Sequence, residues 1–238
     1  MTRLFSSKNR PVHLGPYPLE RLKRQDTADL TGLPPAAPLI FTRPDATESI
    51  VNAMADYQAM MDAIQDGLVN KTRSACPDDL TERANHLKSF GYFSDAAMIG
   101  ICRLPDAAHL DQPWRNPEIE RLAQDLKTRQ TKTLASGIYM IMADLKDAME
   151  SPPATISGHT HAIVFLHARP RPLRPDEPGI DWLKDAEHHA AALRGSETAV
   201  VLANYIRLLG YDAKAHSVST SDVDLNQLAV EALSLIHI

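Results

Sequence analysis

The spacing of apolar residues between positions 50 and 68 constrains the fold of this chain more than any other feature of its sequence. These residues recur at alternating steps of four and three, which places them on one face of an α-helix. They are Ile50, Met54, Tyr57, Met61, Ile64 and Leu68. Either Asp45 or Thr47 can cap the helix start. The pattern therefore predicts a helix that reaches about Val69 and packs this apolar face against the core.

The segment before this helix is rich in proline. Prolines stand at positions 11, 16, 18, 34, 35, 38 and 44, where they remove backbone donors and hold the chain extended. We therefore expect residues 1–45 to form an irregular arm and residues 46–238 to form an α+β domain.

Helix signals recur further along the chain. A second helix is expected from Asp78 to Phe90, closed by Gly91. The Asn116–Pro117 pair is typical of a helix start, and two acidic residues follow it where the positive end of the helix dipole favours them. The apolar stripe of this third helix consists of Ile119, Leu122 and Leu126. Another stripe, made of Leu134, Ile138, Ile141, Leu145 and Met149, predicts a helix that ends at Pro152 and Pro153.

Two apolar runs predict strands. AAMIGICRL covers residues 96–104, and HAIVFLHA at 161–168 suits a central strand. After a proline-rich loop, residues 180–209 are helical again, with a break expected at Gly195 and Ser196 and an end at Gly210. Residues 211–218 alternate as a strand does, and a last helix is expected to begin near residue 224, capped by Ser221, Asp222 or Asp224. This order of helices and strands predicts an α+β fold.

Composition excludes several classes of protein. The formal net charge is -5, and basic residues are scattered among acidic ones, so no basic stripe indicates a nucleic-acid partner. Cys76, expected in a loop, and Cys102, expected to be buried in a strand, cannot form a disulfide framework or a four-thiolate metal site. The sequence carries no secretory signal and no apolar run that could span a membrane, so we expect a cytoplasmic protein.

Histidines form the only clusters that suggest metal chemistry. His159, His161 and His167 make one cluster, and His188 and His189 make another. Histidines two positions apart on a strand share a face and could chelate, but no helical HExxH pair and no carboxylate partner accompanies them. We therefore expect structural histidines and no stoichiometric metal. The residues by themselves identify no catalytic or cofactor-binding position.

Four stretches of the chain match a known family when they are taken together. They are NRPVHLGPYPLERLKR, LKSFGYFSDAAMIGICRLP, HAIVFLH and ETAVVLANYIRLLGYDAKAHSVSTSDVDLNQLAVEA. They resemble the cytoplasmic, catabolic branch of the cobalamin-dependent reductive dehalogenases. The LK…GY…IGI unit is also similar, in looser form, to epoxyqueuosine reductases. The resemblance covers nearly the whole chain but stops short of the length of the dehalogenases.

The resemblance implies a nitroreductase-like α+β core that holds cobalamin, and a ferredoxin-like module with two 4Fe-4S clusters. It also implies a halogenated, phenol-type aromatic substrate and a redox donor as partners. The clusters require cysteine runs of the CxxCxxCxxxCP kind, which this chain lacks. The tyrosine and the basic residue that act in catalysis in the family lie beyond the matching stretch, so no catalytic residue is carried over.

We therefore expect the amino-terminal portion of a reductive dehalogenase, cut within its cobalamin-binding core. The last helix stops after about three turns without a glycine or a basic last turn, and the final SLIHI resembles translated adapter sequence. Two alternatives remain at this point. One is a non-catalytic module, complete as given, that binds a corrinoid, a flavin or another protein. The other is an enzyme similar to epoxyqueuosine reductases.

Overall fold

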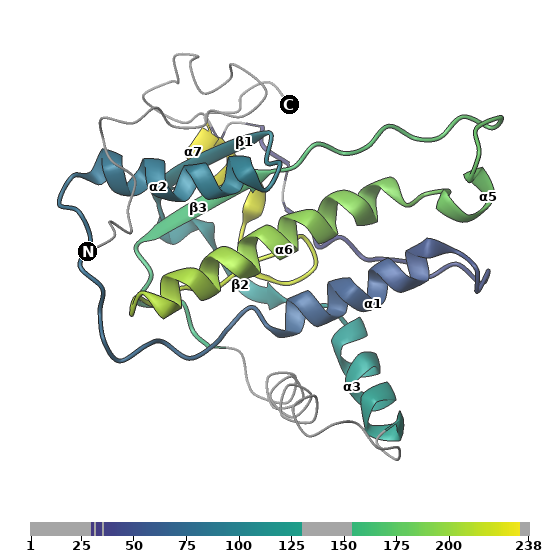
Figure 1. The fold of residues 1–238 in the computed structure, drawn as a ribbon, viewed down its shortest axis with the longest axis horizontal. Helices are drawn as coiled ribbons and strands as arrows, with labels where there is room; N and C mark the ends of the chain where they lie inside the picture. Colours follow the sequence, from purple (N-terminus) through teal and green to yellow (C-terminus); the bar gives the residue numbers. More distant parts are fainter. Residues whose placement is uncertain (1–29, 31, 35, 130–153, 234–238) are drawn as a thin grey trace.

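The computed structural model describes residues 30, 32–34, 36–129 and 154–233. Helices and strands alternate along the described chain in the α+β manner that the sequence predicts (Figure 1). In chain order the elements are α1 (Ile50–Ala63), α2 (Leu80–Phe93), β1 (Met98–Arg103), the 3-10 helix η2 (Asp106–Ala108), β2 (His109–Trp114), α3 (Glu118–Arg129), β3 (His161–Leu166), α5 (Ile180–Leu183), α6 (Glu187–Leu208), β4 (Ser221–Val223) and α7 (Leu225–Leu233).

Both apolar runs that were predicted as strands are strands, and they pair with each other. β1 and β3 run antiparallel, with Gly100 opposite Val164 and Arg103 opposite His161. β2 and β4 form a second antiparallel pair. Among the described residues, β3 pairs with β1 alone. The prediction that HAIVFLHA is a central strand is therefore wrong for this part of the chain, where β3 lies at a sheet edge.

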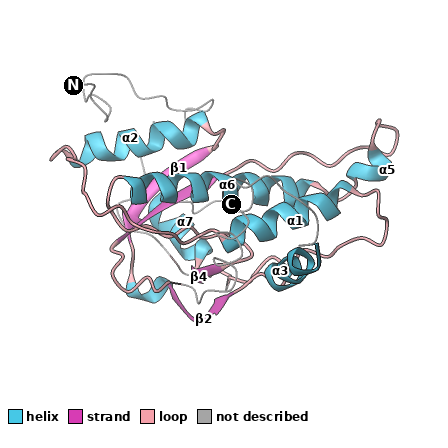
Figure 2. Ribbon diagram, turned by 60° about the horizontal axis from the view of Figure 1, so that its bottom comes forward, coloured by secondary structure: helices cyan, strands magenta, loops and turns pink. Residues whose placement is uncertain are grey.

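Helices cover both faces of the β1–β3 sheet (Figure 2). On the α2 face, Ile163 and Phe165 of β3 pack against a core of Tyr92, Ala96 and Ile99. On the α7 face, Ala162 and Val164 pack against a core of Ala108, Ile156, Val223 and Leu228. Alternate residues of one strand thus contribute to two separate apolar clusters, which explains why the run is apolar throughout.

Gly91 does not end α2, contrary to the prediction. The helix begins after Asp79, whose carboxylate accepts the Thr81 amide at 2.8 Å, and it continues two residues past Gly91. Gly91 is buried against the sheet, where an added Cβ would overlap Ile99 Cδ1 and lie 2.8 Å from Phe165 Cε1. The glycine therefore permits close packing of helix on sheet.

Helix α1 is shorter than predicted and buries a different face. It starts at the cap residue Ser49 rather than at Asp45 or Thr47, and it ends at Ala63 instead of near Val69. Tyr57 is 56% exposed and Leu68, beyond the helix, is 97% exposed. The buried residues are Val51, Ala55, Gln58, Ala59 and Asp62.

The helix that packs against α1 explains why a different face is buried. α1 packs against α6, whose buried residues include the small Ala192, Ser196 and Ala203. Small residues on both helices allow their backbones to approach closely, so small and polar residues of α1 are enclosed. Of the predicted stripe, Met61 and Ile64 pack at the margin of the cluster formed by Val200, Ala203 and Ala215.

Helix α3 begins where the sequence predicts. The Asn116 side chain accepts the Glu118 amide at 3.0 Å, and the acidic residues Glu118 and Glu120 occupy the first turn. The helix predicted from the stripe Leu134 to Met149 lies outside the described residues.

The long carboxy-terminal helix and the segment after it differ from the prediction. The break falls between α5 and α6, at residues 184–186, while Gly195 and Ser196 lie inside α6. Gly210, with φ +84°, ends the helix as expected. Residues 211–218 form a loop rather than a strand, and the strand β4 comes later. Ser221 and Asp222 belong to β4, so Asp224 is the capping residue of α7 and accepts the Gln227 amide at 2.9 Å.

The described residues before position 46 form no helix or strand, and they are attached to the helices. The Leu39 amide donates to the Val218 carbonyl at 2.8 Å. Arg43 forms ion pairs with Asp56 on α1 at 2.7 Å and with Glu118 on α3 at 2.6 Å. The chain before α1 therefore holds these two helices together.

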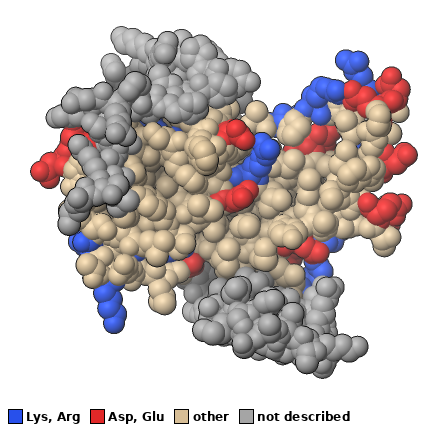
Figure 3. All heavy atoms as spheres, in the orientation of Figure 1, with Lys and Arg blue, Asp and Glu red and all other residues tan. Residues whose placement is uncertain are grey.

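On the face shown in Figure 3, acidic and basic side chains of the described residues are interspersed. None of the described helices has both the length and the apolar character needed to cross a membrane.

Candidate functional site

The larger cavity among the described residues has a volume of about 810 Å³ and lies between β3 and α6. Its other walls are the 211–218 loop and the start of α7. Small side chains of α6 leave the space open, and they are Ala191, Ala192, Gly195, Ser196, Ala199 and Ala203. The volume falls in the range of small-molecule sites, so this cavity is the first candidate for a binding site.

Histidines from several elements face this cavity. His159, His161 and His167 line it from β3 and its flanks, and His188 lines it from α6. The structure thus joins members of both predicted histidine clusters at one cavity. His189 does not belong to the cavity lining, and its ring lies 4.5 Å from the ring of Phe41.

His167 is the histidine best placed to bind a ligand. Both of its ring nitrogens are buried and have no hydrogen-bond partner within the described part of the chain. Burial lowers the pKa of this imidazole, and the nearby positive charge of Arg194 lowers it further. His167 is therefore neutral near pH 7 and can donate one hydrogen bond and accept another.

His216 was not singled out in the sequence, yet it also lines the cavity. Its Nδ1 accepts the Asp222 amide at 3.3 Å, which leaves the proton on Nε2. Burial lowers the pKa of His216 to about 4. The ring is therefore a neutral group with a fixed tautomer in the cavity wall.

A charged cluster joins the 211–218 loop to β4 and its neighbours. Lys214, whose side chain is 4% exposed, forms an ion pair with Asp222 at 2.6 Å and donates to the Ala154 carbonyl at 2.7 Å. Arg115 donates to the other carboxylate oxygen of Asp222 at 2.7 Å. Burial raises the pKa of Asp222, but the two cations outweigh that effect and the net pKa lies below its ordinary value. The positive charge of Lys214 is thus neutralised and is not free for a ligand.

A second network of buried polar groups fixes the same loop to α1. The Asp62 carboxylate accepts hydrogen bonds from Ser217 and Ser219 at 2.6 Å, from Asn116 at 2.8 Å and from Gln58 at 2.9 Å. Burial raises the pKa of Asp62, and these four donors counteract part of the rise. The sequence offered one signal that was missed: polar residues at 58, 62 and 65 recur at helical spacing beside the apolar stripe.

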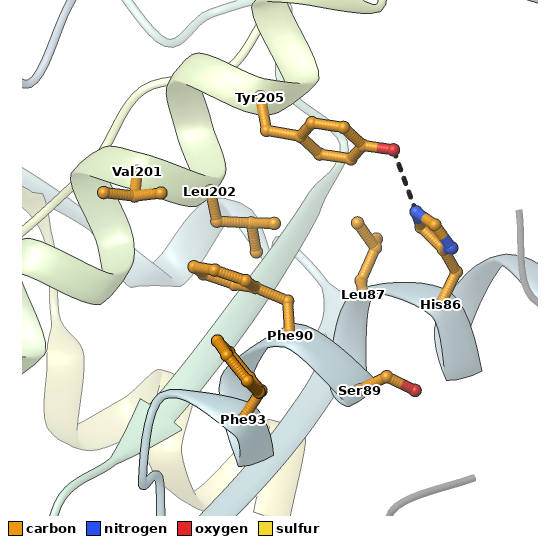
Figure 4. Close-up of a pocket in the computed structure, with 8 residues that line it drawn as sticks. All are labelled: His86, Leu87, Ser89, Phe90, Phe93, Val201, Leu202 and Tyr205. Carbon is orange, nitrogen blue, oxygen red and sulfur yellow. Dashed lines mark hydrogen bonds between the residues drawn. The ribbon is translucent and has the colours of Figure 1, made fainter. Parts of the chain in front are cut away.

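A smaller cavity of about 480 Å³ lies between α2 and α6 (Figure 4). Its walls are mostly apolar and consist of Leu87, Phe90, Phe93, Val201 and Leu202. One polar pair stands at its margin, where His86 Nε2 and the Tyr205 hydroxyl lie 2.9 Å apart. Burial lowers the pKa of His86 and raises that of Tyr205. Phe93 is 84% exposed, so this cavity is an open apolar groove.

The described residues contain no group of three histidines, cysteines or carboxylates that could hold a metal ion. Cys76 and Cys102 are the only thiols of the chain, and each is half-buried. Burial raises the pKa of Cys102 to about 11, which opposes the thiolate form that metal binding requires. Because one four-iron cluster takes four thiolates, the residues present do not fit an iron–sulfur cluster.

A corrinoid also does not fit completely. The larger cavity has the volume of a site for a drug-sized ligand. A cobalamin is much larger than such a ligand and would extend beyond this cavity. The described residues therefore do not form a whole corrinoid site, and no chemical step at cobalt follows from them.

Comparison with solved structures finds similar proteins. The structure of the catabolic reductive dehalogenase NpRdhA superimposes with a TM-score of 0.63 at 29% sequence identity, over 97% of this chain and 27% of that chain. This chain is similar to part of a reductive dehalogenase.

Two further structures match in the same way. NpRdhA in complex with 3-bromo-4-hydroxybenzoic acid matches with a TM-score of 0.63, at 29% identity and over 96% of this chain and 26% of that one. A reductive dehalogenase structure described as suggesting a mechanism for B12-dependent dehalogenation matches with a TM-score of 0.62, 29% identity and the same coverage. No protein-family model and no curated protein matches the sequence. The chain thus spans about a quarter of the length of the dehalogenase structures that it matches.

Proposed function

We propose that this chain supplies the amino-terminal portion of a cobalamin-dependent reductive dehalogenase that removes halide from halogenated, phenol-type aromatics. The observation that carries the proposal is the similarity to NpRdhA, which extends over 97% of this chain at 29% identity. NpRdhA has been solved with a brominated hydroxybenzoate, which supports this substrate class. Corrinoid would supply the dehalogenation chemistry, with two 4Fe-4S clusters and a redox donor as the source of electrons.

The role of this portion is to build and shape part of the core. The β1–β3 sheet, covered by α2 and α7, is its apolar framework. The Asp62 network and the Lys214–Asp222 pair position the 211–218 loop, which forms one wall of the larger cavity. Neutral His167 and His216 offer polar contacts in that cavity to an uncharged part of a ligand.

The proposed division of the chain follows from this role. Residues 1–45 form an arm, and residues 46–238 form the amino-terminal part of a nitroreductase-like, cobalamin-binding core. The iron–sulfur module belongs to a portion of the polypeptide outside this chain, because Cys76 and Cys102 cannot supply eight thiolates. We also propose that the protein acts in the cytoplasm.

One observation favours a second candidate function. The walls of the larger cavity come from described residues of this chain alone, so the chain could bind a small ligand without any further domain. In that case it would be a non-catalytic binding module.

The experiment compares the 238-residue chain with a protein extended along the reading frame of its gene. Both are reconstituted anaerobically with cobalamin and assayed for dehalogenation of a bromophenol or chlorophenol with a strong reductant. We expect the short chain to be inactive and the extended protein to carry both clusters, corrinoid and activity. Turnover by the short chain, or an extension without cysteine motifs, would refute the proposal.

A further inference from the structure

Backbone groups along one edge of β3 have no partner among the described residues. The carbonyls of Thr160 and Leu166 accept hydrogen bonds from the β1 side, from Leu104 at 3.0 Å and from Ala97 at 2.7 Å. In an antiparallel pair, successive residues direct their N–H and C=O groups to opposite edges.

The backbone N–H and C=O groups of the even-numbered residues of β3 therefore point toward β1, and those of the odd-numbered residues point away from it. His161, Ile163 and Phe165 thus direct their N–H and C=O groups to the edge that no described strand covers. These groups line the larger cavity and are open to hydrogen bonds that the described chain does not provide.

The larger cavity runs along this same edge. Each residue from His159 to His167 lines the cavity, and no residue of β1 does. A cavity over one face of a sheet would contact every second residue of a strand, because side chains alternate between the faces. Contact with consecutive residues therefore places the cavity beside the edge of β3. Helix α6, which lies next to β3 (Figure 1), forms the opposite wall.

The occupant that matches this edge is an extended polypeptide segment. Such a segment satisfies a row of N–H and C=O groups by adding a strand. β3 carries no proline and no Asp, Glu, Lys or Arg between His161 and Leu166, so it lacks the features that protect sheet edges from pairing. The added segment would lie between β3 and α6, which forms the opposite wall of the cavity.

We propose that the free edge of β3 receives a strand from the portion of the longer polypeptide outside this chain, and that this strand extends the β1–β3 sheet. The inference rests on the proposed function, and the matched dehalogenase has almost three-quarters of its length outside the match. β3 has 6 residues, so a strand of similar length is required. It is apolar on both faces, because α2 and α7 cover both faces of the existing sheet, and it has no proline where its amides face β3.

Amide hydrogen exchange, resolved by residue, tests this proposal in the 238-residue chain. The amides of Ala162, Val164 and Leu166 are expected to exchange slowly, and those of His161, Ile163 and Phe165 rapidly. Slow exchange of the second set at low protein concentration would mean that a segment of this chain already covers the edge. Slow exchange that develops only at high concentration would mean that a second copy covers it. Either result overturns the proposal.

The extended protein provides the second measurement. There the amides of His161, Ile163 and Phe165 are expected to exchange at least about 100-fold more slowly than in the short chain. If they remain fast, the proposal is wrong, even when clusters, corrinoid and activity in the same sample support the proposed function. A reading frame that ends at Ile238 would refute the proposed function and remove the source of the strand.

Two variants of the extended protein distinguish the effect of losing a backbone amide from the effect of losing a side chain. Ile163→Pro removes an amide that faces the added strand, whereas Ile163→Ala removes most of the side chain and keeps that amide. In the proline variant, exchange of His161 and Phe165 is expected to accelerate at least tenfold relative to the alanine variant, while Val164 stays protected. Equal exchange in the two variants would overturn the proposal.

Discussion

Replacing Asp62 by alanine is expected to destabilise the protein, because this carboxylate accepts four hydrogen bonds shorter than 3 Å from buried donors. Asp62 is 4% exposed. Its Oδ1 accepts from Ser217 and Gln58, and its Oδ2 accepts from Ser219 and Asn116, all between 2.6 and 2.9 Å. The substitution removes all four bonds and leaves weaker links between α1 and the segment after Gly210, such as the bond from Gln58 to Ser219 at 3.3 Å.

The cost depends on which donors find another acceptor. The two serine hydroxyls can turn toward each other, since their oxygens lie 3.2 Å apart. Gln58 keeps a hydrogen bond to Ser196 at 2.7 Å. The side-chain amide of Asn116 has no second acceptor in the described chain, so a buried donor is left unpaired. We expect a loss of about 2–4 kcal/mol, made up of one stranded donor and several weakened bonds and offset in part by removal of a buried charge.

Urea unfolding followed by circular dichroism measures this loss, and Asp56→Ala is the matched control. Asp56 lies on the same helix and is bonded to Arg43 and Arg121, but its side chain is 48% exposed. Exposed ion pairs contribute at most about 1 kcal/mol. Equal losses in the two variants would refute the view that burial of the Asp62 network stabilises the fold.

Three other outcomes are expected. Gly91→Ala should destabilise by about 1–3 kcal/mol, because the added methyl group overlaps the sheet and this outweighs the helix propensity of alanine; an unchanged urea midpoint would contradict this packing. Ile64→Ala should cost about 1–2 kcal/mol and Leu68→Ala almost nothing, since only Ile64 packs against the core; similar losses of stability for both variants in thermal melts would instead support the face predicted from the sequence. Burial raises the pKa of Cys102 to about 11, above its ordinary value of 9.0. The unfolded state therefore ionises first, and the free energy of unfolding should fall between about pH 9 and pH 11; a Cys102→Ala variant with the same pH profile would contradict this.

Local signals in the sequence identified most of the elements. The Asn116–Pro117 pair gave the start of α3, and Gly210 gave the end of α6, because each depends on backbone groups within a few residues. The runs that became β1 and β3 were found because they are apolar on both faces. These features depend on the residue types within a short segment and not on the rest of the fold.

Features that depend on a packing partner could not be predicted in the same way. The stripe on α1 was identified by hydrophobicity, but contact with the small residues of α6 enclosed Ala55, Ala59 and Asp62 instead of Tyr57. Gly91 was interpreted as the end of a helix. A glycine is needed there because the side chain of Ile99 packs directly against it and leaves no room for a Cβ. A periodicity shows that a helix has an apolar face, while the neighbouring helix decides which face is buried.

The 211–218 loop illustrates the same point and connects stability with the candidate site. Its alternating residues predicted a strand, but the loop is bound elsewhere. The Ser217 hydroxyl donates to Asp62 on α1, and the Ala215 amide donates at 3.1 Å to the carbonyl of Gln65, just after α1. His216 lies between these two anchors and faces the cavity beside β3. The position of this cavity wall therefore depends on the Asp62 network. A ligand or strand in the cavity would contact this wall, which α1 supports from behind. Loss of the Asp62 carboxylate is therefore expected to weaken binding in the cavity, although Asp62 itself does not line it.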